Sequence, residues 1–240
     1  MSAPPGLMET RAMTDTLRLT RALVDRLPPR TDERGPLMVD APGPDYYERT
    51  AEAVLSRLER PDELWVFAAG SLIWKPRFTV AERRVAHLDG WRRAFCIGDR
   101  RFRGCPSAPG LMMSLDRGGS CSGVVLRMAP ENLAASLVAM LQTEPPLAPE
   151  WVEASTDAGP VRAIAFAIDR SWPLYVPEPL EEDLADILAS AVGHVGTMAE
   201  YLLNTVTELE RHGVRDPQLW RLQSLVAERL ERLPVPVEGL

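Results

Sequence analysis

Small residues follow an apolar stretch near residue 70, and this pattern can bind an anion. Residues 64–69 are an unbroken apolar run, and Gly70 and Ser71 come directly after it. A turn at this point exposes consecutive backbone N–H groups, which form a concave site for a negatively charged group. A plain tight turn produces the same pattern, so the spacing alone leaves both interpretations open.

A carboxylate stands where a helix is expected to end, and it could transfer protons. Residues 130–143 have the apolar spacing of a helix, and Glu144 follows, just before Pro145 and Pro146. Proline disfavours the helical conformation at the residue before it, which ends the helix at Glu144. In a partly dry pocket the pKa of this carboxyl group would rise. The alternative is an ordinary solvated glutamate at a helix C-terminus.

Three further side chains could contact a ligand. Arg103 lies in a loop before a strand and could bind a carboxylate, although a surface salt bridge is the commoner role of such an arginine. Tyr175 and Tyr201 could supply hydroxyl groups to a pocket, but a buried tyrosine usually has its hydroxyl satisfied within the protein. Cys105 has no histidine near it in sequence, which argues against a nucleophilic thiol.

The histidines and cysteines do not predict a metal site. The histidines are His87, His194 and His212, far apart and without a metal-binding motif. Three cysteines without a Cys-x-x-Cys pair argue against a thiolate zinc site and a disulfide framework. We expect no metal and a reducing compartment, the cytoplasm. The arginine-rich, lysine-poor composition is typical of a bacterial protein.

Charge and hydropathy restrict the partners. The formal net charge of −7 does not favour a nucleic-acid or anionic membrane surface, although five arginines between residues 92 and 103 could form a local basic patch. No apolar run approaches the roughly 18 residues of a membrane span, and the first 30 residues lack a signal-peptide core. We therefore expect no nucleic-acid or membrane partner, and no oligomeric state is predicted.

The periodicity predicts an α+β protein, with strands in the middle of the chain and helices in the C-terminal third. Expected strands are 64–69, 80–90, 91–98, 111–116, 121–128, 150–155 and 161–168. Expected helices are 14–27, 46–59, 130–143, 180–193, 197–213 and 216–233, the last with Asp216 as N-cap and a proline in its first turn. We expect residues 1–60 to be an extension, 61–233 the main domain and 234–240 a tail.

Several segments, taken in order, resemble the ChaC-type gamma-glutamylcyclotransferases. "WVFAAGSLIWKPRF" (65–78) is similar to the family's strand and turn Phe-Gly-Tyr-Gly-Ser-Leu-Ile-Trp, and "LDGWRRAFC" (88–96) to its Gly-aromatic-Arg-Arg-Phe segment. Residues 102–128, "MLQTEPP" and residues 175–216 resemble the later motifs. The resemblance covers about residues 64–230.

The resemblance implies a small mixed β-barrel or roll flanked by helices. It also implies cleavage of glutathione to 5-oxoproline and cysteinylglycine, by attack of the substrate's own amine on its γ-carbonyl. Glu144 would be the acid/base, and no cofactor is needed. The substrate-binding positions would be Ala69, Gly70, Ser71, Leu72, Arg103, Tyr175 and Tyr201.

The chain departs from the family pattern at identifiable positions. Ala69 stands where the family has tyrosine, Thr143 where it has arginine, and the tyrosine that usually follows the glutamate is missing. These differences leave two alternatives open. One is a cyclotransferase for another γ-glutamyl amine or peptide, and the other is a degenerate protein that binds a γ-glutamyl compound without turnover.

Overall fold

The computed structural model describes residues 16–37, 39, 42–60 and 62–235. Its centre is a closed five-stranded barrel in the order β1-β3-β2-β4-β5, in which β1 lies antiparallel to β3 and parallel to β5. The strands are β1 (Trp65–Ala68), β2 (Val80–Asp99), β3 (Gly110–Met128), β4 (Glu150–Thr156) and β5 (Gly159–Ala165). The expected α+β barrel flanked by helices is confirmed.

Two long strands account for most of the barrel. The structure joins the separately expected strands 80–90 and 91–98 into β2, and 111–116 and 121–128 into β3, so those breaks were wrong. Gly90 (φ +80°), where the first expected strand ended, lies at a register shift of the continuous β2–β3 hairpin. Such irregularities bend a strand without ending it, and bending is what allows a sheet to close into a barrel.

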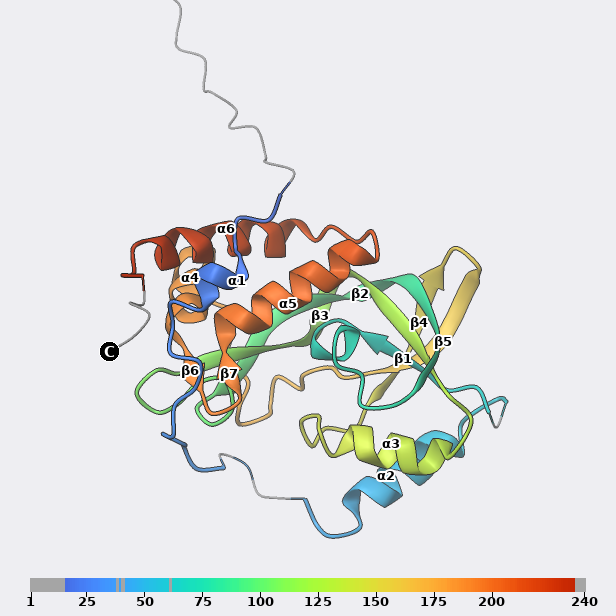
Figure 1. The fold of residues 1–240 in the computed structure, drawn as a ribbon. Coiled ribbons are helices and arrows are strands. Elements are labelled where there is room, and N and C mark those ends of the chain that lie inside the picture. The colour runs from blue at the N-terminus through green and yellow to red at the C-terminus, as the bar shows by residue number, and fades with distance from the viewer. Residues whose placement is uncertain (1–15, 38, 40–41, 61, 236–240) are drawn as a thin grey trace, which may run out of the picture.

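Helices flank the barrel on two sides (Figure 1). The helices α4 (Glu181–Ser190), α5 (Met198–Arg211) and α6 (Pro217–Glu231) pack together, and the short α1 (Arg21–Val24) rests on α5 and α6. On the other side α2 (Tyr46–Leu55) packs against α3 (Leu133–Leu141), as Figure 1 shows. Within the described residues, no helix is both long and apolar enough to span a membrane.

Local signals explain where the helices begin and end. The Asp216 side chain accepts hydrogen bonds from the backbone N–H groups of Gln218 and Leu219, which confirms it as the N-cap of α6. The helix expected to reach Gly193 ends at Ser190, because β6 (Val192–Gly193) pairs with β7 (Gly196–Thr197) in a short hairpin. A 14–27 helix was also wrong: Thr20 caps α1, and residues 14–15 lie outside the described part.

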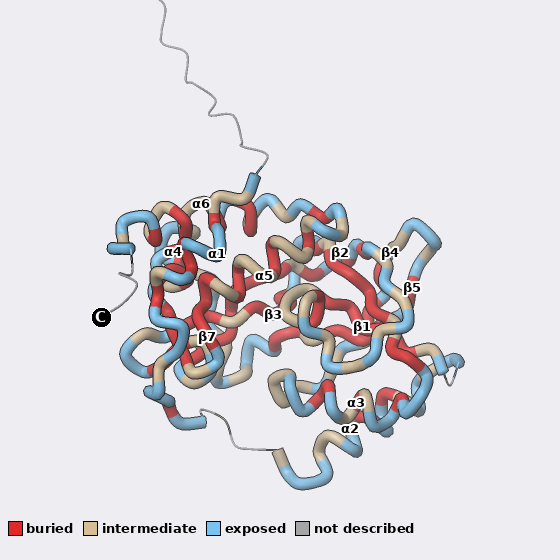
Figure 2. Tube along the Cα trace, in the orientation of Figure 1, coloured by how far each residue is buried: buried red, intermediate tan, exposed pale blue. Residues whose placement is uncertain are grey.

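The described part of the N-terminal extension packs on the main body. Its apolar residues Leu19, Leu23, Val24 and Leu27 join the core cluster that α5 and α6 share with the barrel. The Leu19 N–H donates to Gln223 Oε1 on α6 at 2.8 Å, in a buried position. Figure 2 shows buried residues along the strands and along the helix faces that cover them.

Candidate active site

The turn after β1 forms one wall of a cavity. All four residues of β1 are buried, and the chain leaves the barrel at Ala69 to form the 3₁₀ turn η1 (Ser71–Ile73). This turn is closed by hydrogen bonds from the Ile73 N–H to the Gly70 carbonyl (3.0 Å) and from the Lys75 N–H to the Ser71 carbonyl (2.8 Å). Ala69, Gly70, Ser71 and Leu72 all line the cavity.

Glu144 lines the same cavity, although it lies far from this turn in the sequence. The Glu144 N–H donates to the Leu141 carbonyl at 3.3 Å, which makes Glu144 the end of the turn that closes α3, and Pro145 then leads the chain away. The side chain is partly buried, and burial raises its pKa to about 7, against the opposing charge of Arg77. This environment differs from that of a solvated glutamate, and near neutral pH the carboxyl group can both accept and donate a proton.

Tyr201 brings α5 to the cavity. Its side chain is buried and lines the cavity beside Gly70 and Glu144, and its ring meets the Trp74 ring edge-on at 6.0 Å between centroids. Burial, with a smaller contribution from the charge of Glu144, raises the pKa of Tyr201 to about 12. The phenol therefore stays protonated near neutral pH and can donate a hydrogen bond.

Arg103 and Tyr175 do not line this cavity. Arg103 Nη1 donates to the Thr197 carbonyl at 2.8 Å and pairs with Glu200 Oε2 at 3.0 Å. Its guanidinium carbon lies 5.5 Å from the centroid of the Tyr201 ring, so Arg103 packs beside a cavity residue. Tyr175 forms a β-bridge with Ile97, which does line the cavity.

Sequence reasoning missed the contribution of the barrel wall. Met113, Ser114 and Leu115 of β3 line the cavity, together with Phe166 and Ala167 just after β5. Nothing in their residue types marks them, because only the strand pairing brings them to the turn after β1.

Arg93 supports the cavity turn from within the protein. It is 4% exposed on β2, where its neighbours Ala94 and Phe95 are also buried. Its Nε donates to the Ala69 carbonyl and its Nη2 to the Ser122 carbonyl, each at 2.7 Å, and Nη1 pairs with the Asp216 carboxylate. An arginine within an apolar run was the available signal. These pairings also show that Arg93 does not belong to the surface basic patch that the sequence suggests.

Gly70 is required by a close approach, which gives a first prediction. A Cβ at Gly70 would lie 2.7 Å from Tyr201 Oη, whereas the next atoms are 3.5 Å or more away. Gly70→Ala is expected to displace the phenol and destabilise the protein by about 1–3 kcal/mol. Adding Tyr201→Phe should restore part of the melting temperature, because it removes the clashing atom.

Thermal melts of both variants test this, with Gly43→Ala as control because a Cβ there meets nothing within 4 Å. A Gly70→Ala protein that melts like Gly43→Ala would contradict the close approach.

Comparisons with known proteins agree with this architecture. The family model described as ChaC-like protein matches residues 64–229. The glutathione-specific gamma-glutamylcyclotransferase of Escherichia coli is 34% identical over 178 residues, which cover 72% of this chain and 77% of that protein. Glutathione-specific gamma-glutamylcyclotransferase 1 of Danio rerio is 28% identical over 172 residues, 67% of this chain and 87% of that protein.

A solved structure shares the fold. The crystal structure of a yeast gamma-glutamyl cyclotransferase specific to glutathione superposes with a TM-score of 0.64 at 18% identity, covering 70% of this chain and 96% of the yeast chain. The family match spans the barrel, the Gly70 turn, Glu144 and Tyr201 in one continuous segment. The chain therefore belongs to the ChaC-like protein family.

Proposed function

We propose that this protein cleaves glutathione to 5-oxoproline and cysteinylglycine as a γ-glutamylcyclotransferase. The observation that carries the proposal is the placement of Glu144, with a pKa of about 7, in one cavity with the Gly70–Leu72 turn. The names of the Escherichia coli and Danio rerio relatives support the same reaction.

The chemistry needs one proton to move across the substrate. The α-amine of the γ-glutamyl group attacks its own γ-carbonyl, so a C–N bond forms while the amide C–N bond to the cysteine nitrogen breaks. The α-ammonium first gives one proton to the solvent. Glu144 then takes the second proton from the attacking amine and delivers it to the leaving nitrogen, which is protonated again by solvent after release. Because the attack is intramolecular, holding the substrate in a bent conformation supplies much of the rate enhancement. The balanced reaction consumes no cofactor.

The turn and Tyr201 are suited to the substrate's negative oxygens. We assign the backbone N–H groups of Ser71 and Leu72 to the α-carboxylate or to the oxyanion that develops on the γ-carbonyl. Among the described residues that line the cavity there is no lysine or arginine. Backbone N–H groups and hydroxyl groups must therefore donate the hydrogen bonds to the substrate's oxygens. The Tyr201 phenol, protonated near neutral pH, lies beside Gly70 and is a side-chain donor in the cavity.

A second substrate class has one specific observation in its favour. Ala69 lines the cavity at the position where the family has tyrosine, so a smaller side chain borders the bound ligand. A γ-glutamyl amine or peptide with a bulkier group beside Ala69 would use that space. The same site without turnover would make the protein a γ-glutamyl-binding protein.

The deciding experiment measures 5-oxoproline release from glutathione, γ-glutamyl dipeptides and γ-glutamyl amines by the purified protein. We expect the highest kcat/KM with glutathione. Faster release from another γ-glutamyl compound would support the second substrate class. Heat stabilisation by glutathione without any release would support binding alone, because a ligand of the folded state raises its apparent stability.

The pH profile provides a further prediction. Because Glu144 must be ionised to accept the proton, kcat/KM is expected to rise with pH through a midpoint near 7. Initial rates between pH 5 and 8.5 at low glutathione concentration measure that midpoint. A midpoint near 4.5, the ordinary pKa of a glutamate, would contradict a buried acid/base.

The proposal places the protein in the cytoplasm with a small-molecule substrate and with no nucleic-acid or membrane partner. All three cysteines are buried as free thiols, which supports a reducing compartment.

A further inference from the structure

The connection between β5 and α4 forms part of the cavity wall and has little regular structure of its own. Phe166 and Ala167, at its start, line the cavity. The connection is attached first to β3, where the Ile168 N–H donates to the Leu115 carbonyl at 2.8 Å. It is then attached to β2, where the Val176 N–H donates to the Cys96 carbonyl at 2.9 Å. A further bond to β2 runs from the Gly98 N–H to the Leu174 carbonyl at 2.8 Å, and apolar residues of the connection pack on Ala94 and Cys96.

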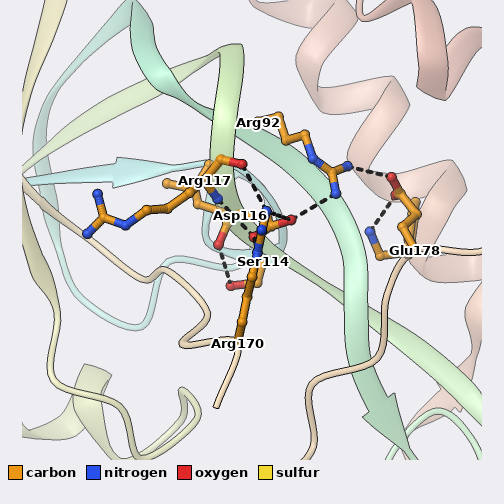
Figure 3. Close-up of polar contacts among 8 residues, drawn as sticks. Arg92, Ser114, Asp116, Arg117, Arg170 and Glu178 are labelled. Carbon is orange, nitrogen blue, oxygen red and sulfur yellow. Dashed lines mark hydrogen bonds and ion pairs between the residues drawn. The ribbon is translucent and has the colours of Figure 1, made fainter. Parts of the chain in front are cut away.

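A buried carboxylate fixes the first half of this connection. Asp116 of β3 is fully buried, and its oxygens accept hydrogen bonds from Arg170 Nε (2.8 Å) and Nη2 (3.0 Å), both from the connection. They also accept from Arg92 Nη2 on β2, at 2.8 Å. Figure 3 shows the carboxylate lying between the two guanidinium groups. Although burial acts to raise the pKa of Asp116, the two arginines and the Arg117 N–H hold it below its ordinary value.

A second carboxylate fixes the other half. Glu178, near the end of the connection, accepts from Arg92 Nη1 and from the Phe95 N–H, each at 2.7 Å. Arg92 therefore bridges both carboxylates, as Figure 3 shows. The two attachments enclose residues 170–178, so the segment is held at both ends by one set of charges.

The chemistry of these contacts favours a geometric role. A buried ion pair often adds little net stability, because desolvation offsets the attraction. A bidentate arginine–carboxylate contact nevertheless fixes distance and direction, whereas an apolar contact lets two surfaces slide. Asp116 is two residues from Ser114 on β3, and Ser114 lines the cavity. The contact therefore fixes the connection to the strand that forms the neighbouring part of the wall.

We propose that Arg92, Asp116, Arg170 and Glu178 form a charge clamp, which positions the 166–178 connection and thereby its first residues, Phe166 and Ala167, in the wall of the substrate cavity. The clamp residues are positioning residues for substrate binding and do not take part in proton transfer. This inference rests on the proposed function for the identity of the substrate.

Arg170→Gln is the sharpest test. Arg170 is half-exposed and Arg92 still faces Asp116 in its absence, so this variant is expected to fold. KM for glutathione should rise about tenfold while kcat stays within about twofold, because one charge-assisted contact to the wall is lost. The midpoint of the pH profile should not move. Arg170→Lys keeps the charge but not the fork geometry. Its KM for glutathione should lie between that of the wild type and that of Arg170→Gln.

Arg162→Gln is the matched control, since Arg162 lies on β5 and its partners do not line the cavity. These partners are Glu59, the Arg57 carbonyl and the Trp151 ring, whose centroid lies 4.3 Å from the guanidinium carbon. Its KM should equal that of the wild type. Equal KM values for Arg170→Gln and Arg162→Gln would overturn the clamp.

A second measurement separates failure of the clamp from failure of the proposed function. Hydrogen exchange of residues 166–178 should be faster in Arg170→Gln than in Arg162→Gln, whatever the protein catalyses. If the wild type releases no 5-oxoproline, the proposed function fails, and the clamp is judged by exchange together with calorimetric binding of glutathione. Unchanged exchange, or equal affinity in the two variants, would overturn it.

Discussion

Glu144→Gln is expected to lower kcat for 5-oxoproline release by about 10²–10⁴-fold, the usual contribution of a positioned acid/base. Glutamine keeps the size of the side chain in the cavity but can neither take the proton from the attacking amine nor return it to the leaving nitrogen. KM should change little, since the turn and Tyr201 are untouched. Initial rates at saturating glutathione, compared with those of the wild type, give the ratio of kcat values directly.

Glu150→Gln provides the control, because Glu150 is an exposed glutamate at the start of β4, six residues further along. Its kcat should match that of the wild type. A Glu144→Gln enzyme that keeps more than a tenth of wild-type kcat would rule out Glu144 as the acid/base.

Glu144→Gln should raise the stability of the protein at alkaline pH while it lowers the activity. The pKa of Glu144 is raised to about 7 in the folded protein, so the folded state holds this proton more tightly than the unfolded chain does. The contribution of the group to stability is therefore lost as pH rises from about 4.5 to about 7. At pH 8, Glu144→Gln should be more stable than the wild type by about 1–3 kcal/mol, and at pH 4 the two should match. Denaturant melts at both pH values test this and show that lost activity is not lost folding.

Arg93→Met is expected to destabilise the protein by about 3–5 kcal/mol, the cost of breaking a buried ion pair from one side. The substitution also leaves the carbonyl oxygens of Ala69 and Ser122 without their guanidinium donor. A loss of this size should lower the melting temperature by about 10 °C. Thermal melts test it against Arg83→Met, an exposed arginine on the same strand, which should melt like the wild type.

If Arg93→Met fails to fold, Asp216→Asn tests the contact instead. It separates the contribution of the Arg93–Asp216 ion pair to stability from its effect on the cavity turn. Asparagine still caps α6 but removes the charge that Arg93 faces, so the cost should be smaller, at about 1–2 kcal/mol. KM for glutathione should also rise, because the Ala69 carbonyl is held by the same guanidinium. If both Arg93→Met and Asp216→Asn are as stable as the wild type, Arg93 does not support the cavity turn.

The sequence was a good guide to the parts of the site that depend on local signals. Glu144 is fixed by a helix that ends and a proline that follows, and both features can be recognised over a few residues. The Gly70 turn likewise follows from an apolar strand and two small residues. Each motif could therefore be located before the cavity that joins them was known.

Features that depend on strand pairing could not be predicted in this way. The sequence predicts a strand that ends at Gly90, but Gly90 lies within a long hairpin, at a shift in the strand register. Arg103 looked suited to bind a ligand carboxylate, but tertiary packing gives it Glu200 as partner. The charge clamp joins β2, β3 and residues 170–178, three segments that no local pattern connects.

The barrel has a consequence for how the chain matures during synthesis. The parallel pairing of β1 with β5 joins Val66 to Ile164, roughly a hundred residues later. Tyr201 and Asp216, which complete and support the cavity, are made later still. Such distant contacts form slowly. The edge of β1 that pairs with β5 therefore stays unpaired while the rest of the chain is synthesised, and an unpaired strand edge favours aggregation. An abortive fragment ending before α5 would thus be a client for chaperones and would lack the wall that Tyr201 supplies.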